Sequence, residues 1–237
     1  AESARLRAQT EEMRSSLLSA VSHDVRTPLA TIKGAATTLR SQAAKLTPEV
    51  SNELLDSISD EAERLSRLVG NILDMTRLES GIQLRRDLYP VEEIAGAALQ
   101  RLEPQLAGSE IITSLPEDLP LISVDDVLIG QVLTNLIENA VKYTPSGGRI
   151  QVRVGPDSAH HNWAQLEVAD TGVGIPAEAH ARIFEAFTQA DGSLTRRHGG
   201  SGLGLTLAQT FVQQHQGVIE CDSQPGRTDF KILIPLP

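Results

Sequence analysis

The chain has 237 residues, of which 40% are hydrophobic and 22% are charged. This length predicts one large or two small domains, and the composition is typical of a globular protein. The net charge of -10 argues against the basic face that nucleic-acid binding needs. The single cysteine, Cys221, excludes an internal disulfide. No apolar run approaches the roughly 20 residues that cross a bilayer, and the first residues are not those of a signal peptide.

Residues 1–40 are predicted to form one long helix. Apolar side chains recur there at helical spacing with polar residues between them, and the stretch from Leu6 to Val21 is close to a heptad repeat. Because this pattern is already under way at residue 1, we expect the chain to be part of a longer protein.

A second helix is predicted from Pro48 to about Glu79. Thr47 suits its N-cap, Pro48 suits its first position and Gly81 suits its end. Its apolar stripe consists of Leu54, Ile58, Leu65, Leu68, Ile72 and Met75. Together the two helices predict an αα-hairpin that leaves much of its stripe uncovered. A second copy would cover it, so we expect a dimeric four-helix bundle.

The pattern changes near residue 83, where short alternating segments begin. These predict an α/β sandwich with helices on one face of a sheet. Strands are expected at 83–88, 110–115, 121–124, 148–154, 163–170, 217–222 and 228–234, and helices at 91–106, 126–143, 177–187 and 203–215. A stretch rich in Gly, Ser and Arg covers residues 189–202.

Four short motifs carry the candidate chemistry, and the first surrounds His23. Pro28 removes a backbone donor and clashes with the preceding turn, so we expect the helix to bend beside His23. The imidazole could attack phosphorus through one nitrogen while Asp24 holds the proton on the other. Thr27 follows His23 by four residues and shares its face. Taken alone, the motif could equally be an exposed histidine beside a structural proline.

The second motif places Asn135, Asn139 and Lys142 on one face of the predicted helix 126–143. Two amide oxygens and an ammonium group suit a hydrated Mg²⁺ ion with its phosphates. Tyr143 adds a flat ring that could pack on a base. The alternative is a polar helix face with a C-terminal lysine that the helix dipole favours.

The third and fourth motifs are turns that lead into helices. Asp170, at a strand end, could accept a hydrogen bond from an adenine amino group, and Gly172 and Gly174 would let the backbone approach the ring. An ordinary turn favours the same residues. Glycines at residues 199–204 precede a helix, where free backbone amides bind phosphate. This loop is neither a Walker A motif nor a dinucleotide fingerprint.

In this order the motifs resemble those of the bacterial sensor histidine kinases. His23 lies in what looks like the H box. Residues 135–143 look like the N box, 170–176 like the G1 box, 184–187 like the F box and 200–205 like the G2 box. The resemblance implies a dimerisation and histidine-phosphotransfer domain at 1–82 and an ATP-binding domain of the Bergerat type at 83–237. That ATP-binding fold is shared with Hsp90-like chaperones, type II topoisomerases and mismatch-repair ATPases.

The resemblance also implies catalytic roles for residues of the first domain. His23 would accept the phosphoryl group, Asp24 would be its acid/base partner, and Thr27 would align water for dephosphorylation of a response regulator. Because this chain contains no receiver domain, that regulator would be a separate protein.

For the second domain, the resemblance implies a site for ATP and Mg²⁺. Asn139, helped by Asn135, would bind Mg²⁺, and Asp170 would read the adenine. Residues 188–201 would form the ATP lid. Other nucleotide contacts would come from Lys142, Tyr143, Gly172, Gly174, Gly200, Gly202, Leu203 and Gly204.

Within the family, residues 22–39 and 71–81 look similar to the KdpD-type potassium-sensing kinases, whereas residues 187–192 and 226–230 look more like other subfamilies. The implied protein is a homodimer through its hairpin. It would be the cytoplasmic portion of a membrane-anchored bacterial protein.

Two other functions stay open. One is a nucleotide-binding dimer that scaffolds or dephosphorylates a regulator with little kinase chemistry. The other is an Hsp90-like or topoisomerase-like ATPase, whose water-activating glutamate would fall where this chain has Asn135. Elsewhere, His180 and His215 are interpreted as surface helix positions, and Cys221 as a core residue.

Overall fold

The computed structural model describes residues 25–42, 45–79, 84–116, 119–157, 159–160, 162–185 and 202–237. The chain divides into two compact units, Ala1–Ser80 and Gly81–Pro237. Among the residues described, no helix combines the length and the apolar character that crossing a membrane requires.

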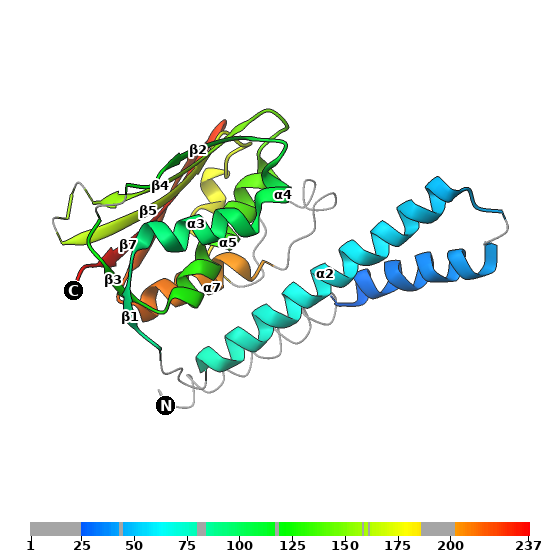
Figure 1. The fold of residues 1–237 in the computed structure, drawn as a ribbon, viewed down its shortest axis with the longest axis horizontal. Helices are drawn as coiled ribbons and strands as arrows, with labels where there is room; N and C mark the ends of the chain where they lie inside the picture. The colour runs from blue at the N-terminus through cyan, green and yellow to red at the C-terminus, as the bar shows by residue number, and fades with distance from the viewer. Residues whose placement is uncertain are drawn as a thin grey trace. The chain divides into compact units, whose positions relative to one another are not determined.

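In its described part, the first unit consists of a helix at residues 25–42 followed by a longer helix, α2, which spans Pro48–Glu79 (Figure 1). Thr47 caps α2 as predicted, because its Oγ1 accepts a hydrogen bond from the Val50 N–H at 3.4 Å.

Large apolar side chains lie on the surface of this single hairpin. Leu29, Leu55, Val69 and Leu73 are 50%, 53%, 50% and 52% exposed, although Leu68 is buried. Apolar side chains that repeat along a helix surface are typical of a face that another helix covers.

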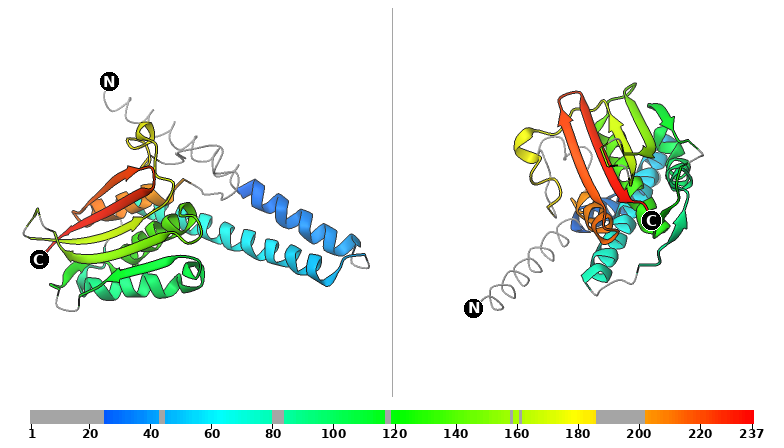
Figure 2. Two further views of the ribbon diagram at one scale, coloured as in Figure 1. Left: turned by 90° about the horizontal axis from the view of Figure 1, so that it is seen from above. Right: turned by 90° about the vertical axis from the view of Figure 1, so that its left-hand side faces the viewer.

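The second unit is a two-layer α/β sandwich, as predicted (Figures 1 and 2). Its main sheet has the order β2-β4-β5-β7-β6, in which β2 and β4 are parallel and the other neighbours antiparallel. The strands are β2 (Glu110–Ser114), β4 (Arg149–Pro156), β5 (Trp163–Asp170), β6 (Val218–Gln224) and β7 (Arg227–Pro235). A separate ribbon pairs β1 (Asp87–Tyr89) with β3 (Ile122–Val124).

Helices α3 (Val91–Arg101), α5 (Asp126–Tyr143) and α7 (Gly204–Gln214) cover one face of this sheet (Figure 2). Alternate residues of the central strands face them, as the two-residue period of a strand requires. This core includes Leu166, Val168, Ile232 and Ile234 from the sheet and Ile129, Leu133, Ile137 and Phe211 from the helices, all at most 1% exposed.

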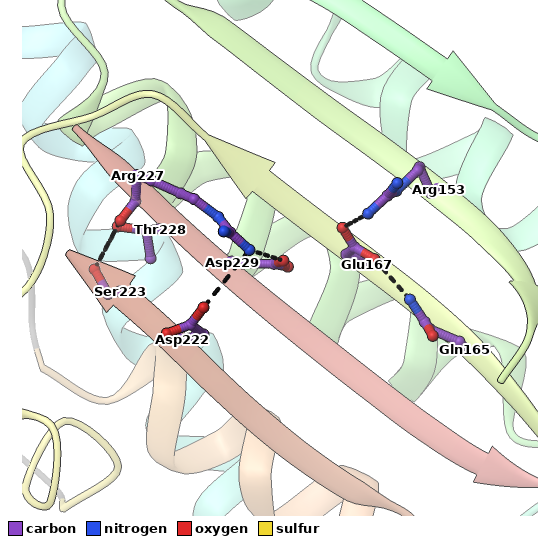
Figure 3. Close-up of polar contacts among 8 residues, drawn as sticks. All are labelled: Arg153, Gln165, Glu167, Asp222, Ser223, Arg227, Thr228 and Asp229. Atoms are coloured by element: carbon purple, nitrogen blue, oxygen red, sulfur yellow. Dashed lines mark hydrogen bonds and ion pairs between the residues drawn. The ribbon is translucent and has the colours of Figure 1, made fainter. Parts of the chain in front are cut away.

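The opposite face of the sheet carries charged side chains. Arg153, Glu167, Lys231 and Glu220 lie directly opposite one another across β4, β5, β7 and β6, with alternating charge. Glu167 is only 2% exposed. It forms an ion pair with Arg153 and accepts a hydrogen bond from Gln165 Nε2 at 2.6 Å (Figure 3). These partners satisfy its buried charge.

Three predicted elements differ from the structure. The helix expected at 91–106 is broken at Leu102, because Pro104 lies in the first turn of a second short helix, α4 (Glu103–Leu106), and has no N–H to continue α3. The strand expected at 83–88 is confined to β1, because its partner β3 is only three residues long. The helix expected at 177–187 is wrong in its described part. Only Ala177–Ala179 form a 3₁₀ helix, and the following bonds, such as Arg182 N–H to Ala179 O, span three residues.

Candidate nucleotide site

Helix α5 carries most of the predicted nucleotide residues. It begins at Asp125, whose Oδ1 accepts a hydrogen bond from the Leu128 N–H at 3.3 Å. The apolar side chains of α5 face the sheet, which leaves Asn135 and Asn139 half-buried. Among the described residues the side chain of Asn139 makes no hydrogen bond, so both ends of its amide are available to a ligand.

The glycine-rich loop meets α5 at Asn135. The Asn135 Nδ2 donates to the Gly204 carbonyl oxygen at 3.4 Å. Gly202 has a φ of 64°, a conformation that glycine adopts without strain, and the side chain of Leu203 is fully buried. The loop therefore enters α7 in a fixed position against α5. Gly200 and the expected lid at 188–201 lie outside the described residues.

Asp170 ends β5 and lies beside the last turn of α5. It is 6% exposed, and its Oδ1 accepts a hydrogen bond from the Gly172 N–H at 2.8 Å. The Val173 N–H donates to the Tyr143 carbonyl oxygen at 3.2 Å, which attaches the turn to α5. A Cβ at Gly172 would lie 2.5 Å from Asp170 Oδ1 and 2.6 Å from the Tyr143 carbonyl oxygen. Only glycine allows this close approach.

Burial raises the pKa of Asp170 from 3.8 to about 6. The Gly172 N–H and the Thr144 hydroxyl oppose this rise, and the charge of Asp229 adds to it. Thr144 Oγ1 is buried and has no partner within hydrogen-bond geometry among the described residues, so its effect on Asp170 is that of a nearby dipole. Asp170 is thus charged at neutral pH in a site that favours a hydrogen-bond donor.

Gly174 lies further along the same turn. Its φ is 79°, and a Cβ there would come within 2.4 Å of the Gln224 carbonyl oxygen. The next residue, Ile175, donates its N–H to Ser223 Oγ at 2.8 Å. The turn after Asp170 is therefore fixed between α5 and the end of β6.

Lys142 and Tyr143 are the last two residues of α5, the end of the helix that the turn after Asp170 contacts. The Lys142 Nζ lies 4.8 Å from the centre of the Tyr143 ring, a cation–π contact, and Tyr143 is 36% exposed. Both side chains are thus accessible to a ligand at this end of the helix.

The structure brings three of the four motifs together: the helix of Asn135 and Asn139, the turn after Asp170, and the loop before α7. The first motif belongs to the other unit. Thr27 and Pro28 lie in the helix of residues 25–42, with Thr27 exposed and Pro28 buried. His23 and Asp24 lie outside the described residues, so the bend expected beside His23 stays a prediction.

Two residues of interest were missed or misread in the sequence. Thr144, which immediately follows α5, is 9% exposed beside Asp170. His215, expected on the surface, is 1% exposed. The signal was present, because Ala208, Phe211, Val212 and His215 recur at the spacing of one helix face, and the first three are buried.

The polar groups of this site fit an adenine nucleotide. A buried carboxylate and an unpartnered buried hydroxyl, on Asp170 and Thr144, suit the polar edge of a purine. Amide oxygens on Asn135 and Asn139 are ligands of the type that Mg²⁺ prefers. The backbone at the N-terminus of α7 suits phosphate.

Comparison with known families identifies a phospho-acceptor domain and an ATPase domain in this chain. Residues 13–81 match the His Kinase A (phospho-acceptor) domain, and residues 124–237 match the histidine kinase-, DNA gyrase B- and HSP90-like ATPase family. The sensor protein KdpD of Escherichia coli K12 is 38% identical over 242 residues, which cover 99% of this chain and 26% of that protein. KdpD of Clostridium acetobutylicum is 34% identical over 236 residues, with 99% and 26% covered. The chain thus spans about a quarter of the length of these curated relatives.

Solved structures share the architecture. Histidine kinase ThkA in complex with response regulator protein TrrA gives a TM-score of 0.73 at 23% identity, covering 98% of this chain and 65% of that chain. Full-length ShkA in complex with AMPPNP gives 0.66 at 28% identity, covering 93% and 45%. With one family match in each compact unit, phospho-acceptor domain first and ATPase domain second, the chain belongs to the sensor histidine kinases and contains both domains of a protein-histidine kinase core.

Proposed function

We propose that this chain transfers the γ-phosphoryl group of ATP to His23 and then to an aspartate of a separate response regulator, which it also dephosphorylates. Residues 1–82 would dimerise and carry the phospho-acceptor, and residues 83–237 would bind ATP. The observation that carries the proposal is that α5 contacts two of the other motifs: the glycine-rich loop, through Asn135 and Gly204, and the turn after Asp170, through Tyr143.

Each part of the nucleotide has a candidate partner. Asp170 accepts a hydrogen bond from the adenine amino group, and Gly172 and Gly174 allow the ring to approach the backbone. Tyr143 packs on the nucleotide, and Lys142 contacts phosphate. The glycine-rich loop meets the phosphates through the backbone of Gly200, Gly202, Leu203 and Gly204.

Asn139 and Asn135 are the residues that would hold Mg²⁺. The Asn135 Nδ2 donates to Gly204, so its Oδ1 is the atom left to face a cation. When bound, Mg²⁺ supplies neutralisation of phosphate charge.

The chemical step is an in-line displacement. A neutral ring nitrogen of His23 attacks the γ-phosphorus, the bond to the bridging oxygen breaks, and ADP leaves. Asp24 accepts a hydrogen bond from the other ring nitrogen and stabilises its positive charge. Thr27, one turn after His23, positions water for hydrolysis of the phosphorylated regulator.

The partners follow from the hairpin. Its exposed leucines and valines support a homodimer that forms a four-helix bundle. The ThkA structure, solved with a response regulator, supports a regulator bound in trans. We also propose that the chain is the cytoplasmic portion of a membrane-anchored protein, because the KdpD relatives are sensor proteins that are much longer than this chain.

An ATPase without a phosphoprotein is less well supported. In such an enzyme a carboxylate activates the attacking water, and position 135 is the expected place. The Asn135 amide cannot take a proton from water, and its Nδ2 is already engaged by Gly204.

Labelling with ATP that is radioactive at the γ-phosphate tests the proposal. Wild type and His160→Gln, a matched variant at an exposed loop histidine, should acquire label that acid removes and alkali does not. His23→Gln should acquire none. Equal labelling of His23→Gln and wild type, or ATP hydrolysis with no labelled protein, would contradict the proposal.

A further inference from the structure

His215 joins the end of α7 to the beginning of α5. The residue is 1% exposed. Its Nδ1 lies 2.7 Å from the Phe211 carbonyl oxygen, and the Asp125 backbone N–H donates to its Nε2 at 2.9 Å. Because Nε2 accepts a hydrogen bond, the ring is neutral and carries its proton on Nδ1, which donates to Phe211.

Besides the apolar packing between α5 and α7, this contact is a polar link from the start of α5 to the end of α7. At the other end of the pair, Asn135 Nδ2 donates to the Gly204 carbonyl oxygen at 3.4 Å, so the helices are antiparallel. Asp125 and Asn135 are separated by about 15 Å of helix rise, and Gly204 and His215 by about 16 Å. These two contacts, at matching separations, add to the apolar packing in opposing a sliding of one helix along the other.

The segment that enters this unit is attached at the same point. The Arg85 N–H donates to Asp125 Oδ2 at 3.2 Å, and the Arg86 guanidinium donates to the Gln214 carbonyl oxygen in the last turn of α7. A cation at the C-terminus of a helix is favourable. Residues 85 and 86 therefore contact both helices beside His215.

The end of α7 is itself rigid. The Gly217 N–H donates to the Val212 carbonyl oxygen and the Gln216 N–H to that of Gln213, each at 2.9 Å, which is a Schellman motif. Gln216 has a φ of 61°, which a non-glycine residue adopts only when its surroundings require it. The His215 ring is thus presented from a fixed backbone.

Burial favours the neutral form of the ring. Burial and then the positive charge of Arg86 lower the pKa of His215, while the Phe211 carbonyl and the charge of Asp125 act in the opposite direction. The net pKa lies below the ordinary value of 6.5. Protonation at acid pH turns Nε2 into a donor that faces the Asp125 N–H, so the contact is lost as the pH falls.

We propose that neutral His215 is a positioning residue for phosphoryl transfer, which holds α5 and α7 in the register where Asn135, Asn139 and Gly204 meet one nucleotide. Arg85 and Arg86 contact the start of α5 and the end of α7 beside His215. Movement of residues 85 and 86 would therefore shift α5 relative to α7 and change the geometry of the nucleotide site. This inference rests on the proposed nucleotide site.

Calorimetric titration of the full chain with ADP and Mg²⁺ tests it. His215→Leu should bind ADP about five- to tenfold more weakly, the equivalent of about one net hydrogen bond. His215→Gln should stay within about twofold of wild type, because its amide supplies one donor and one acceptor. The matched variant His160→Gln, in an exposed loop, should bind as wild type does, because its amide can still donate to Asp157, the partner of the His160 ring.

Two further readouts separate positioning from general stability. Hydrogen exchange of the Asp125 amide should be about tenfold faster in His215→Leu and unchanged in His215→Gln. As the pH falls below about 6.5, wild type should lose more ADP affinity than His215→Gln, because the pKa of His215 lies below that value. Asp170 also titrates in this range, but it does so in both proteins, and the difference between the profiles reports His215.

The proposal is overturned if folded His215→Leu binds ADP as tightly as wild type, or if the two pH profiles are parallel. The second comparison decides the matter even where His215→Leu does not fold. Failure of wild type to bind ADP would instead refute the nucleotide site, and exchange at the Asp125 amide would still report the contact with His215.

Discussion

Asp170→Asn should make the protein more stable while it weakens nucleotide binding. Burial raises the pKa of Asp170 from 3.8 to about 6, so the folded state holds this proton more tightly than the unfolded chain does. Stability from this group is therefore highest below about pH 4 and is lost as the pH rises towards 6. Well above pH 6 the charged carboxylate lowers the free energy of unfolding by about 3 kcal/mol, because each pKa unit corresponds to 1.36 kcal/mol.

Asparagine removes this cost because it stays neutral. Its Oδ1 can still accept from the Gly172 N–H, although the bond is weaker without charge. We expect a gain of about 1 to 3 kcal/mol in the free energy of unfolding near pH 8, which shrinks towards zero near pH 4. Affinity for ADP should fall about tenfold or more, because a buried acceptor for the adenine amino group is lost.

Urea unfolding, followed by the fluorescence of Trp163, measures the stability of this unit. Trp163 is the only tryptophan and lies on the same strand as Asp170. Carboxylates that do not interact with Asp170 titrate equally in both proteins, so the difference in free energy reports position 170 together with its repulsion by Asp229. A difference that does not change with pH, or a less stable variant near pH 8, would refute the reasoning.

Other predictions address the rest of the site. Mg²⁺ should increase the affinity of wild type for ADP, and Asn139→Ala should abolish this increase. The control Asn162→Ala, at an exposed position, should keep it. Calorimetric titration with ADP, with and without EDTA, measures the increase. Gly172→Ala should lose about 2 kcal/mol or more in urea unfolding, because its Cβ would lie 2.5 Å from Asp170 Oδ1. Gly96→Ala, in α3 with nothing within 4 Å, should instead gain about 1 kcal/mol. Burial raises the pKa of Cys221 to about 12, so iodoacetamide should modify it about a hundredfold more slowly in the folded protein, and equal rates would contradict this.

The two-layer fold was predictable because its signals are local. Alternation along Trp163–Asp170 and the helical periods of α5 and α7 place each element's apolar face without reference to the others. The segment after Pro176 was not, because its bonds span three residues and its apolar spacing resembles that of a helix.

The candidate site could be predicted as residues but not as contacts. Asn135 and Gly204 are 69 positions apart, and nothing in either motif indicates that the Asn135 amide reaches the Gly204 carbonyl oxygen. His215 was misread for a related reason: a histidine near a helix end is usually solvated, and its partner, the Asp125 N–H, is 90 residues away. The apolar periodicity of α7 predicts the burial of His215 correctly, because it places His215 on the same helix face as Phe211 and Val212.

The charged row on the outer face of the sheet also bears on how the sheet forms. Arg153, Glu167, Lys231 and Glu220 stand opposite one another across four strands. A slip of one residue in any of these strands would turn its charge into the apolar core, because neighbouring residues face opposite sides. The apolar residues alone would tolerate a slip of two positions, but such a slip would separate Glu167 from Arg153. The row therefore favours the native alignment of these four strands, and with it the position of Asp170 at the end of β5.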